Sequence, residues 1–389
     1  MENKVDQANK VLLSAKLTES DVYPVSEIFT FHPEFAEVSD FKLLELNQHL
    51  EEELEKGDTL YINGSSSDNT VLCTNTNTFN VFTAETSNSL LISNGLKLHN
   101  NIKDEKEKCV HDVTVVGISY EYFVVAQIKP DFNKVKQLLS TTVYRGKEHE
   151  YEVDESKLLT FEDLWMKTQA SKEELKSTIK DLNVVTINNK LRILEFEYHF
   201  RVLSFMLKLI DEFSWNLEQI CYEETVNSLV DLVPSDIINS MFSMYTEETK
   251  MIDGVQLYRY KEREVCRFFA QVLLYSAGKF NFKDFMQAWE ESVPEGMKVE
   301  ENMLHGIALI NRKSMPNVIW MFSEFDLPDT INDRFKVLFE AKERWSYEEI
   351  APYIARLTTD KLDVNALLAK HARNFKVNDV KYYSSKHLK

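Results

Sequence analysis

Lysines at helical spacing are the first feature of this sequence that could do chemistry. Lys172, Lys176 and Lys180 recur every four residues, so a helix places them on one face. Lys190 and Arg192 follow on a predicted hairpin. Ammonium and guanidinium groups bind phosphate oxygens and supply much of the affinity of proteins for nucleic acids. These five residues predict a DNA contact. The alternative is a solvated helix face of mixed charge, because acidic residues are interspersed.

Basic residues gather a second time at the carboxy-terminal end. Residues 365–389 have a net charge of +5, whereas the whole chain has a net charge of −18. The DNA-binding candidates here are Lys370, Arg373, Lys376 and Lys381. Tyr382 and Tyr383 follow, and aromatic rings beside cations can stack nucleic-acid bases. The alternative is a basic tail that only increases solubility.

Enzyme motifs are absent from the sequence. It contains no GxxxxGK[ST], GxGxxG, GxSxG or HExxH pattern, and only 9 of its 389 residues are glycine. Glycine-rich loops are the usual cradles for nucleotide phosphates. Cys109 and His111 offer two ligands where tetrahedral zinc needs four. We therefore expect a protein that is not an enzyme, with no catalytic residue, no metal and no cofactor.

The composition also bears on the compartment. The 4 cysteines include no CxxC pair, which is typical of free thiols in a reducing compartment. The charged amino terminus does not resemble a secretory signal, and no apolar run approaches the ~20 residues of a membrane helix. The acidic balance argues against a surface that grips nucleic acid or membrane everywhere. We expect a soluble protein whose contacts with anions are local.

The chain changes character near residue 150. Before that point, short apolar runs alternate with turn residues, which predicts a β-rich domain over residues 1–150 with helices near 46–54 and 133–139. The spacing of these runs indicates a meander or small barrel. A barrel so small is a candidate for incomplete closure, and an open sheet edge needs a partner. The sequence therefore favours an obligate complex.

From about residue 158 the hydrophobic period becomes that of helices. Capping side chains that could begin helices are Thr160 with Asp163, Ser171 with Glu174, Asn216 with Gln219, Asn281 with Asp284, and Ser346 with Glu349. Asn188-Asn189 and Asp253-Gly254 suit type I′ hairpin turns. Two helices followed by a hairpin, repeated, is the pattern of winged helices. The predicted modules are 158–214, 215–280 and 281–389, the last either enlarged or made of two units.

The second of these modules differs from the first in charge. Its second helix, Pro234 to Glu247, has no basic residue before Lys250. Recognition helices that read DNA display Lys, Arg, Asn or Gln. We therefore expect this module to contact protein. The fold class is α+β, with an N-terminal β-barrel-like domain followed by tandem winged-helix domains.

Several local strings, in order along nearly the whole chain, resemble the sister chromatid cohesion protein Dcc family. They are Phe41 to Leu46, Val71 to Cys73, Ala84 to Asn88 with Leu90-Leu91, Arg192 to Phe196, Ser292 to Met297, Ile350 to Ile354 and Ala366 to Lys370. The resemblance implies a non-catalytic subunit of the alternative replication factor C clamp loader, with the ATPase in other subunits. It also implies a nuclear protein that acts in DNA replication and sister chromatid cohesion.

The resemblance further implies the partners. The β region would assemble with the small cohesion subunit and the carboxy-terminal tail of the large subunit of the loader into a composite barrel. The winged helices would contact single- and double-stranded DNA and dock on the catalytic subunit of DNA polymerase epsilon, with the sliding clamp an indirect partner in its loading or unloading. The main alternative is a winged-helix scaffold subunit of another nuclear complex. A sequence-specific transcription factor fits less well, because no helix concentrates base-reading side chains.

Overall fold

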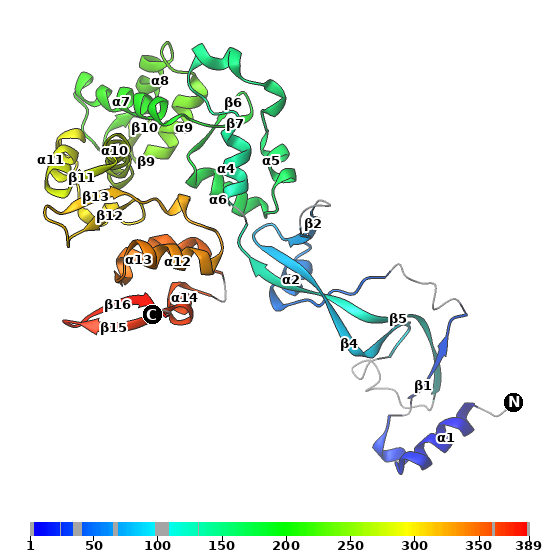
Figure 1. Cartoon of the computed structure of the whole chain (residues 1–389). Coiled ribbons are helices and arrows are strands. Elements are labelled where there is room, and N and C mark those ends of the chain that lie inside the picture. The colour runs from blue at the N-terminus through cyan, green and yellow to red at the C-terminus, as the bar shows by residue number, and fades with distance from the viewer. Residues whose placement is uncertain are drawn as a thin grey trace. The chain divides into compact units, whose positions relative to one another are not determined.

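The computed structural model describes residues 4–23, 25–33, 41–64, 69–97, 109–130, 132–359 and 362–386. The chain divides into two compact units. One comprises Met1–Leu60, Ser65–Leu72 and Phe79–Ala126, and the other comprises Tyr61–Gly64, Cys73–Thr78 and Gln127–Lys389. Helices and strands occur together along the chain, so the predicted α+β class is confirmed (Figure 1). Among the described residues, no helix has the length and apolar character that crossing a membrane requires.

The amino-terminal half contains one five-stranded sheet in the order β1-β5-β4-β3-β2. Its strands are β1 (Val25–Phe31), β2 (Tyr61–Asn63), β3 (Val71–Cys73), β4 (Thr78–Asn94) and β5 (Cys109–Ile128). β1 pairs in parallel with β5. The end strands β1 and β2 are not paired with each other, so the described residues form an open sheet. The expected barrel-like domain is therefore not a closed barrel in the described residues, in line with the incomplete closure that the sequence suggested.

Two helices accompany these strands in the first unit. α2 (Gln48–Glu55) confirms the helix expected near residues 46–54, and the Asn47 side chain caps it by accepting a hydrogen bond from the Leu50 N–H. Leu50 packs with Leu72 and Phe79 in a small buried cluster. The sequence prediction missed α1 (Lys4–Ala15), on which Val11 and Leu13 are largely exposed.

The second unit repeats one order of elements. In each of three repeats the elements follow the order helix, strand, helix, helix and hairpin. The single strand pairs with the last strand of the hairpin in the same repeat. The three sheets are therefore β8-β10-β9, β11-β13-β12 and β14-β16-β15. Preceding them is a first repeat with three helices and the two-stranded sheet β6-β7. In Figure 1 the repeats follow one another from α4 to the β15–β16 hairpin.

The bounds of these elements are as follows. The first repeat has α4 (Phe132–Ser140), α5 (Phe161–Lys167), α6 (Lys172–Asp181), β6 (Val184–Ile187) and β7 (Lys190–Ile193). The second has α7 (Phe196–Glu212), β8 (Ile220–Cys221), α8 (Tyr222–Leu229), α9 (Ser235–Tyr245), β9 (Thr246–Ile252) and β10 (Val255–Tyr260). The third has α10 (Glu262–Ala277), β11 (Lys279–Asn281), α11 (Phe282–Ser292), the 3₁₀ helix η5 (Glu301–Leu304), β12 (Ala308–Asn311) and β13 (Val318–Met321). The fourth has α12 (Ile331–Ala341), β14 (Trp345–Ser346), α13 (Tyr347–Ile354), the 3₁₀ helix η7 (Ala355–Leu357), α14 (Val364–His371), β15 (Ala372–Val377) and β16 (Val380–Ser385).

The predicted turns and caps are mostly present. Asn188, Asn189, Asp253 and Gly254 all have positive φ, and both predicted hairpins form. Complete capping boxes begin α5 at Thr160 and α13 at Ser346, whereas Ser171 and Asn281 begin helices through a single cap hydrogen bond. The expectation for Asn216 is wrong. Its side chain closes a turn by accepting from the Glu218 N–H, and strand β8 follows. The predicted limits of the modules stay a prediction.

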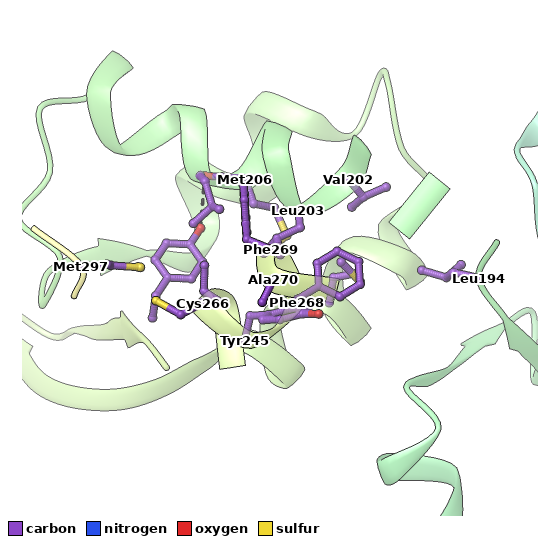
Figure 2. Packing of buried hydrophobic residues seen from close by; sticks show 14 of the residues in the cluster. Leu194, Val202, Leu203, Met206, Tyr245, Cys266, Phe268, Phe269, Ala270 and Met297 are labelled. Carbon is purple, nitrogen blue, oxygen red and sulfur yellow. Dashed lines mark hydrogen bonds between the residues drawn. The ribbon is translucent and has the colours of Figure 1, made fainter. Parts of the chain in front are cut away.

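One hydrophobic cluster spans the second and third repeats and also includes Tyr144, Val185 and Leu194 of the first. Figure 2 shows Phe268 and Phe269 of α10 beside Leu203 and Met206 of α7 and Tyr245 of α9. The same cluster continues to Trp289 of α11 and Ile319 of β13, which are fully buried. Because a shared core links these repeats, we expect them to move as one body.

Candidate nucleic-acid interface

The three lysines predicted on one helix lie on α6. Lys176 and Lys180 are exposed and Lys172 is half-buried, while Leu175 and Thr178 of the same helix are buried. The Lys172 ammonium lies 4.4 Å from the centre of the Trp165 ring, and Lys176 pairs with Glu173 at 2.7 Å. Partial neutralisation leaves Lys180 as the most available cation of this helix face. Both the phosphate-contact hypothesis and the mixed-charge alternative match parts of this surface.

Arg192 does not belong to this surface. Its side chain is 2 % exposed, and its guanidinium makes two 3.0 Å bonds to the carboxylate of Glu150. The same group donates to the backbone carbonyls of Thr142 and Val143. A buried guanidinium that makes four hydrogen bonds inside the protein is not available to phosphate. The prediction of a DNA contact by Arg192 is therefore corrected to a structural role.

The Lys190 side chain also interacts with groups of its own repeat. Its ammonium donates to the Leu158 carbonyl at 3.3 Å and lies 3.8 Å from Asp163. The wing that carries Lys190 is fixed at its tip, because the Asn188 N–H donates to Asp236 of α9 at 2.9 Å. Lys190 is therefore a weaker candidate for DNA than the α6 lysines.

The carboxy-terminal basic residues form part of a folded hairpin. Lys370 lies in the last turn of α14, Arg373 and Lys376 lie on β15, and Lys381 lies on β16; all four are exposed. Lys376 and Lys381 stand directly opposite each other across the two strands. Like charges in this position repel, and a bound anion would relieve the repulsion. Through folding, two lysines that are five residues apart become one cationic pair.

The aromatic groups near these cations differ from the expected ones. Tyr383 is buried in the core of the fourth repeat, so the expectation that it stacks on a base is wrong. Tyr382 remains half-buried and stacks on Phe375, with ring centres 6.1 Å apart. The Arg344 guanidinium lies 5.5 Å from the centre of the Phe375 ring. Sequence reasoning missed Phe375 and Arg344, because only strand register and the fold of α12 and β14 bring them together.

A cavity of about 570 Å³ lies next to this hairpin. Tyr382 and Arg344 line it, and Trp320 and Trp345 contribute indole rings. Several of its cations are paired with carboxylates, as in the 2.6 Å contact of Lys342 with Glu349. Burial lowers the pKa of His371 in the last turn of α14, and Lys370 and Lys386 lower it further, which disfavours the charged form of this histidine.

Charge also accumulates where α6 meets the second repeat. Burial lowers the pKa of Lys261, and the neighbouring Lys180 ammonium lowers it further. Lys261 donates to the carbonyls of Ser243 and Met244 at the end of α9. Glu247 and Glu264 act on this pKa in the opposite direction, so the surface here carries charges of both signs.

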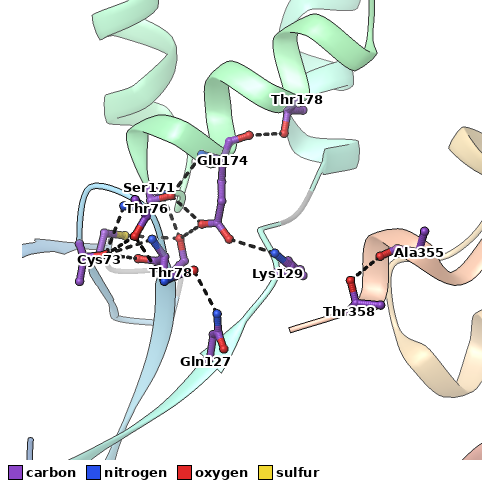
Figure 3. Close-up of polar contacts among 12 residues, drawn as sticks. Cys73, Thr76, Thr78, Gln127, Lys129, Ser171, Glu174, Thr178, Ala355 and Thr358 are labelled. Atoms are coloured by element: carbon purple, nitrogen blue, oxygen red, sulfur yellow. Dashed lines mark hydrogen bonds and ion pairs between the residues drawn. The ribbon is translucent and has the colours of Figure 1, made fainter. Parts of the chain in front are cut away.

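A polar cluster fixes the amino terminus of α6 (Figure 3). The Glu174 carboxylate accepts from the hydroxyls of Thr78 and Ser171, both at 2.7 Å, and the Lys129 ammonium lies 3.6 Å away. The Ser171 N–H donates back to the Thr78 hydroxyl at 2.8 Å. Because these hydrogen bonds join α6 to Thr78, the orientation of α6 and its lysines is set by a group far away in sequence.

Four side chains in the described part of the chain bear on metal binding and nucleophilic chemistry. Cys109 and His111 lie on β5, and the described part of the chain holds no group of three His, Cys, Asp or Glu side chains placed to bind a metal. Burial raises the pKa of Cys73 to about 11 and that of Cys266 to about 12, so neither is a ready nucleophile.

Fold and surface together define an α+β protein with an open sheet in its described residues and an array of small helix-and-hairpin repeats. The family model "Sister chromatid cohesion protein Dcc1" matches residues 41–354, so the chain belongs to this family. A curated relative named sister chromatid cohesion protein DCC1 from Xenopus tropicalis is 34% identical over 390 residues, with 99% of each chain covered. That from Homo sapiens is 34% identical over 391 residues, again with 99% of each chain covered. The protein named "Probable sister chromatid cohesion protein DCC1" from Dictyostelium discoideum is 28% identical over 85% of this chain and 89% of its own length.

Proposed function

We propose that this chain is a non-catalytic subunit of an alternative replication factor C clamp loader. In the nucleus it would link the loader to DNA and to DNA polymerase epsilon while the sliding clamp is loaded or unloaded during replication and sister chromatid cohesion. The observation that carries the proposal is family membership together with an open, partly apolar sheet edge. Relatives along nearly the full length are named for sister chromatid cohesion.

The sheet edge supports assembly with other subunits. β1 lies at one end of the sheet, and its residues Phe29 and Phe31 are 46% and 53% exposed. Residues two apart in a strand lie on one face, so the two rings form a continuous apolar surface. An edge of this kind attracts a further strand. We assign this role to the small cohesion subunit and the tail of the large subunit, which would complete the composite barrel.

Substitutions on β1 test this assembly. The paired change Phe29→Asp and Phe31→Asp should abolish co-purification of the full-length chain with both partner subunits. Met315 is 100% exposed in the loop between β12 and β13, so Met315→Asp is a control that adds a charge in the second unit. If the β1 variant assembles as well as the control, the composite-barrel proposal fails.

The repeats of the second unit support a winged-helix assignment. A strand before the second helix that pairs with the last strand of the hairpin is the expected order of that fold. The β9–β10 hairpin, which is the wing of the second repeat, exposes Met251, Ile252 and Val255 beside the Asp253-Gly254 turn. Glu247 and Glu248 lie on the same hairpin, so we assign this module to protein contact with the polymerase.

The fourth repeat is the proposed DNA contact, with Lys172, Lys176 and Lys180 of α6 in support. Changing Arg373, Lys376 and Lys381 to Glu in the full-length chain should reduce the salt slope of DNA binding by about 2 to 3, since each lost phosphate contact removes roughly 0.7 to 0.9. The matched control reverses three other exposed lysines, Lys208, Lys250 and Lys283. An unchanged slope in the first variant would remove the hairpin from the interface.

A further inference from the structure

The segment Ser323–Thr330, between β13 and α12, touches three of the four repeats. Its Asp326 carboxylate lies 3.0 Å from the Lys136 ammonium, and Asp329 accepts from the Asn133 amide at 2.5 Å; both partners lie on α4 of the first repeat. The segment thus joins residues that are about 190 positions apart in the sequence.

Arg356 of η7 adds a third contact with the first repeat. Its guanidinium lies 3.3 Å from the carboxylate of Asp181, the last residue of α6. The same guanidinium lies 3.8 Å above the ring of Phe325, so this side chain also packs on the connecting segment. Cation–π packing holds the guanidinium in one orientation toward Asp181.

The fourth repeat and α10 of the third repeat fix the segment from the other side. The buried Arg334 of α12 donates to the carbonyls of Leu327 and Pro328 and to the carboxylate of Asp329. Burial raises the pKa of Glu324, while Arg356, Arg267 and Arg334 act in the opposite direction. A carboxylate among three arginines keeps the segment attached to the third and fourth repeats.

The contacts of Ser323–Thr330 with the first repeat differ from its contacts with the fourth repeat, because those with the first repeat are polar and partly exposed. The Lys136 and Asp326 side chains are 47% and 63% exposed. Among the described residues, the buried clusters centred on the first repeat and on the fourth share no member. Exposed ion pairs contribute little singly and weaken with salt. By comparison, the core shared by the second and third repeats, which also includes Val185 of the first, is apolar and buried.

We propose that Asp326, Asp329 and Arg356 form an electrostatic latch that closes the first repeat onto the fourth and opens as ionic strength rises. The latch ends at Asp181, next to Lys180, so its state sets the spacing between the α6 lysines and the basic hairpin. That last consequence rests on the proposed DNA contact, whereas the latch itself does not.

Hydrogen exchange of the full-length chain without DNA tests the latch, so its outcome is independent of any DNA contact. The amides of Asp326 and Leu327 are the reporters, because they donate to Ser323 and Glu324 within the segment. Asp181→Arg and Arg356→Asp should each speed their exchange roughly 3- to 10-fold, as expected for loss of one partly exposed ion pair. The combined variant restores a pair of opposite charges and should return toward the wild-type rate. Raising sodium chloride from 0.1 to 1 M should speed exchange in the wild type and have little effect on the single variants.

The control is Lys176→Asp, which reverses a charge on the same helix α6 but breaks only the local pair with Glu173. It should leave the reporter amides unchanged. If the combined variant exchanges as fast as the single ones, or if salt has no effect on the wild type, the latch is wrong. Should Arg356→Asp fail to fold, the swap of Lys136→Asp with Asp326→Lys applies the same criteria.

Discussion

Thr78 and Thr178 are buried threonines that contact the same glutamate, and they should respond differently to one substitution. The substitutions are Thr78→Val and Thr178→Val in separate variants, because valine keeps the shape of the side chain and removes the hydroxyl. Thr78 donates to the Glu174 carboxylate at 2.7 Å and accepts from the Ser171 N–H at 2.8 Å, whereas Thr178 donates only to the Glu174 backbone carbonyl, also at 2.8 Å (Figure 3).

The expected magnitudes follow from what each change leaves behind. Thr78→Val removes a hydrogen bond to a charged group and leaves the fully buried Ser171 N–H without its hydroxyl acceptor. Each of these effects is worth roughly 1 to 3 kcal/mol, and together we expect a loss of about 3 kcal/mol. Thr178→Val leaves no buried donor without an acceptor, and the Glu174 carbonyl keeps its hydrogen bond within the helix. The free energy of unfolding should therefore decrease by less than about 1 kcal/mol.

Thermal unfolding of the full-length chain, followed by circular dichroism and calorimetry, measures the difference. For a unit of this size, about 3 kcal/mol corresponds to a decrease of roughly 6 to 10 °C in the transition of the second unit. Thr178→Val should lower it by less than about 3 °C. Equal shifts for the two variants would refute the view that the Thr78, Ser171 and Glu174 network fixes α6.

Two further predictions concern buried charged and titratable groups. Arg192→Met should lower the free energy of unfolding by about 3 kcal/mol in urea titrations, because Glu150 and two backbone carbonyls lose their hydrogen-bond partner. An unchanged free energy of unfolding would contradict the structural role of Arg192. Burial lowers the pKa of His199 to about 4, below the ~6.5 of an unfolded histidine, so the unfolded state binds more protons between these values. Stability should therefore fall as the pH decreases from about 6.5 to 4, by about 2 kcal/mol between pH 7 and 5. His199→Gln, measured by urea unfolding at both pH values, should lose this component, and an equal pH dependence in the variant would contradict the assignment.

Local features of the sequence were predictable because local physics decides them. Asn188-Asn189 and Asp253-Gly254 take positive φ at little steric penalty, so their hairpins could be located without a structure. The capping residues Thr160, Ser171 and Ser346 likewise begin helices wherever the chain lies. The prediction that Asn216 begins a helix was wrong because its side chain accepts the Glu218 N–H in an Asx turn instead.

The candidate interface was only partly predictable, since burial is a tertiary property. Lys172, Lys176 and Lys180 share a helix face through their spacing alone, yet nothing in the spacing separates the buried Arg192 from the more exposed Lys190 two positions earlier. Arg192 is buried because the Thr142 and Val143 carbonyls and the Glu150 carboxylate, which lie about 40 to 50 positions earlier in the sequence, accept its hydrogen bonds.

By itself the sequence determined the α+β class, the sites of its turns and caps, the basic carboxy-terminal end and the family. Only the tertiary structure decided that the amino-terminal sheet stays open in the described residues and that Tyr383 is a core residue. It also decided that Asp181 meets Arg356 across 175 positions. The physical reason is that caps and turns depend on neighbours along the chain, whereas burial, edge pairing and ion pairs depend on which distant segments the core brings together.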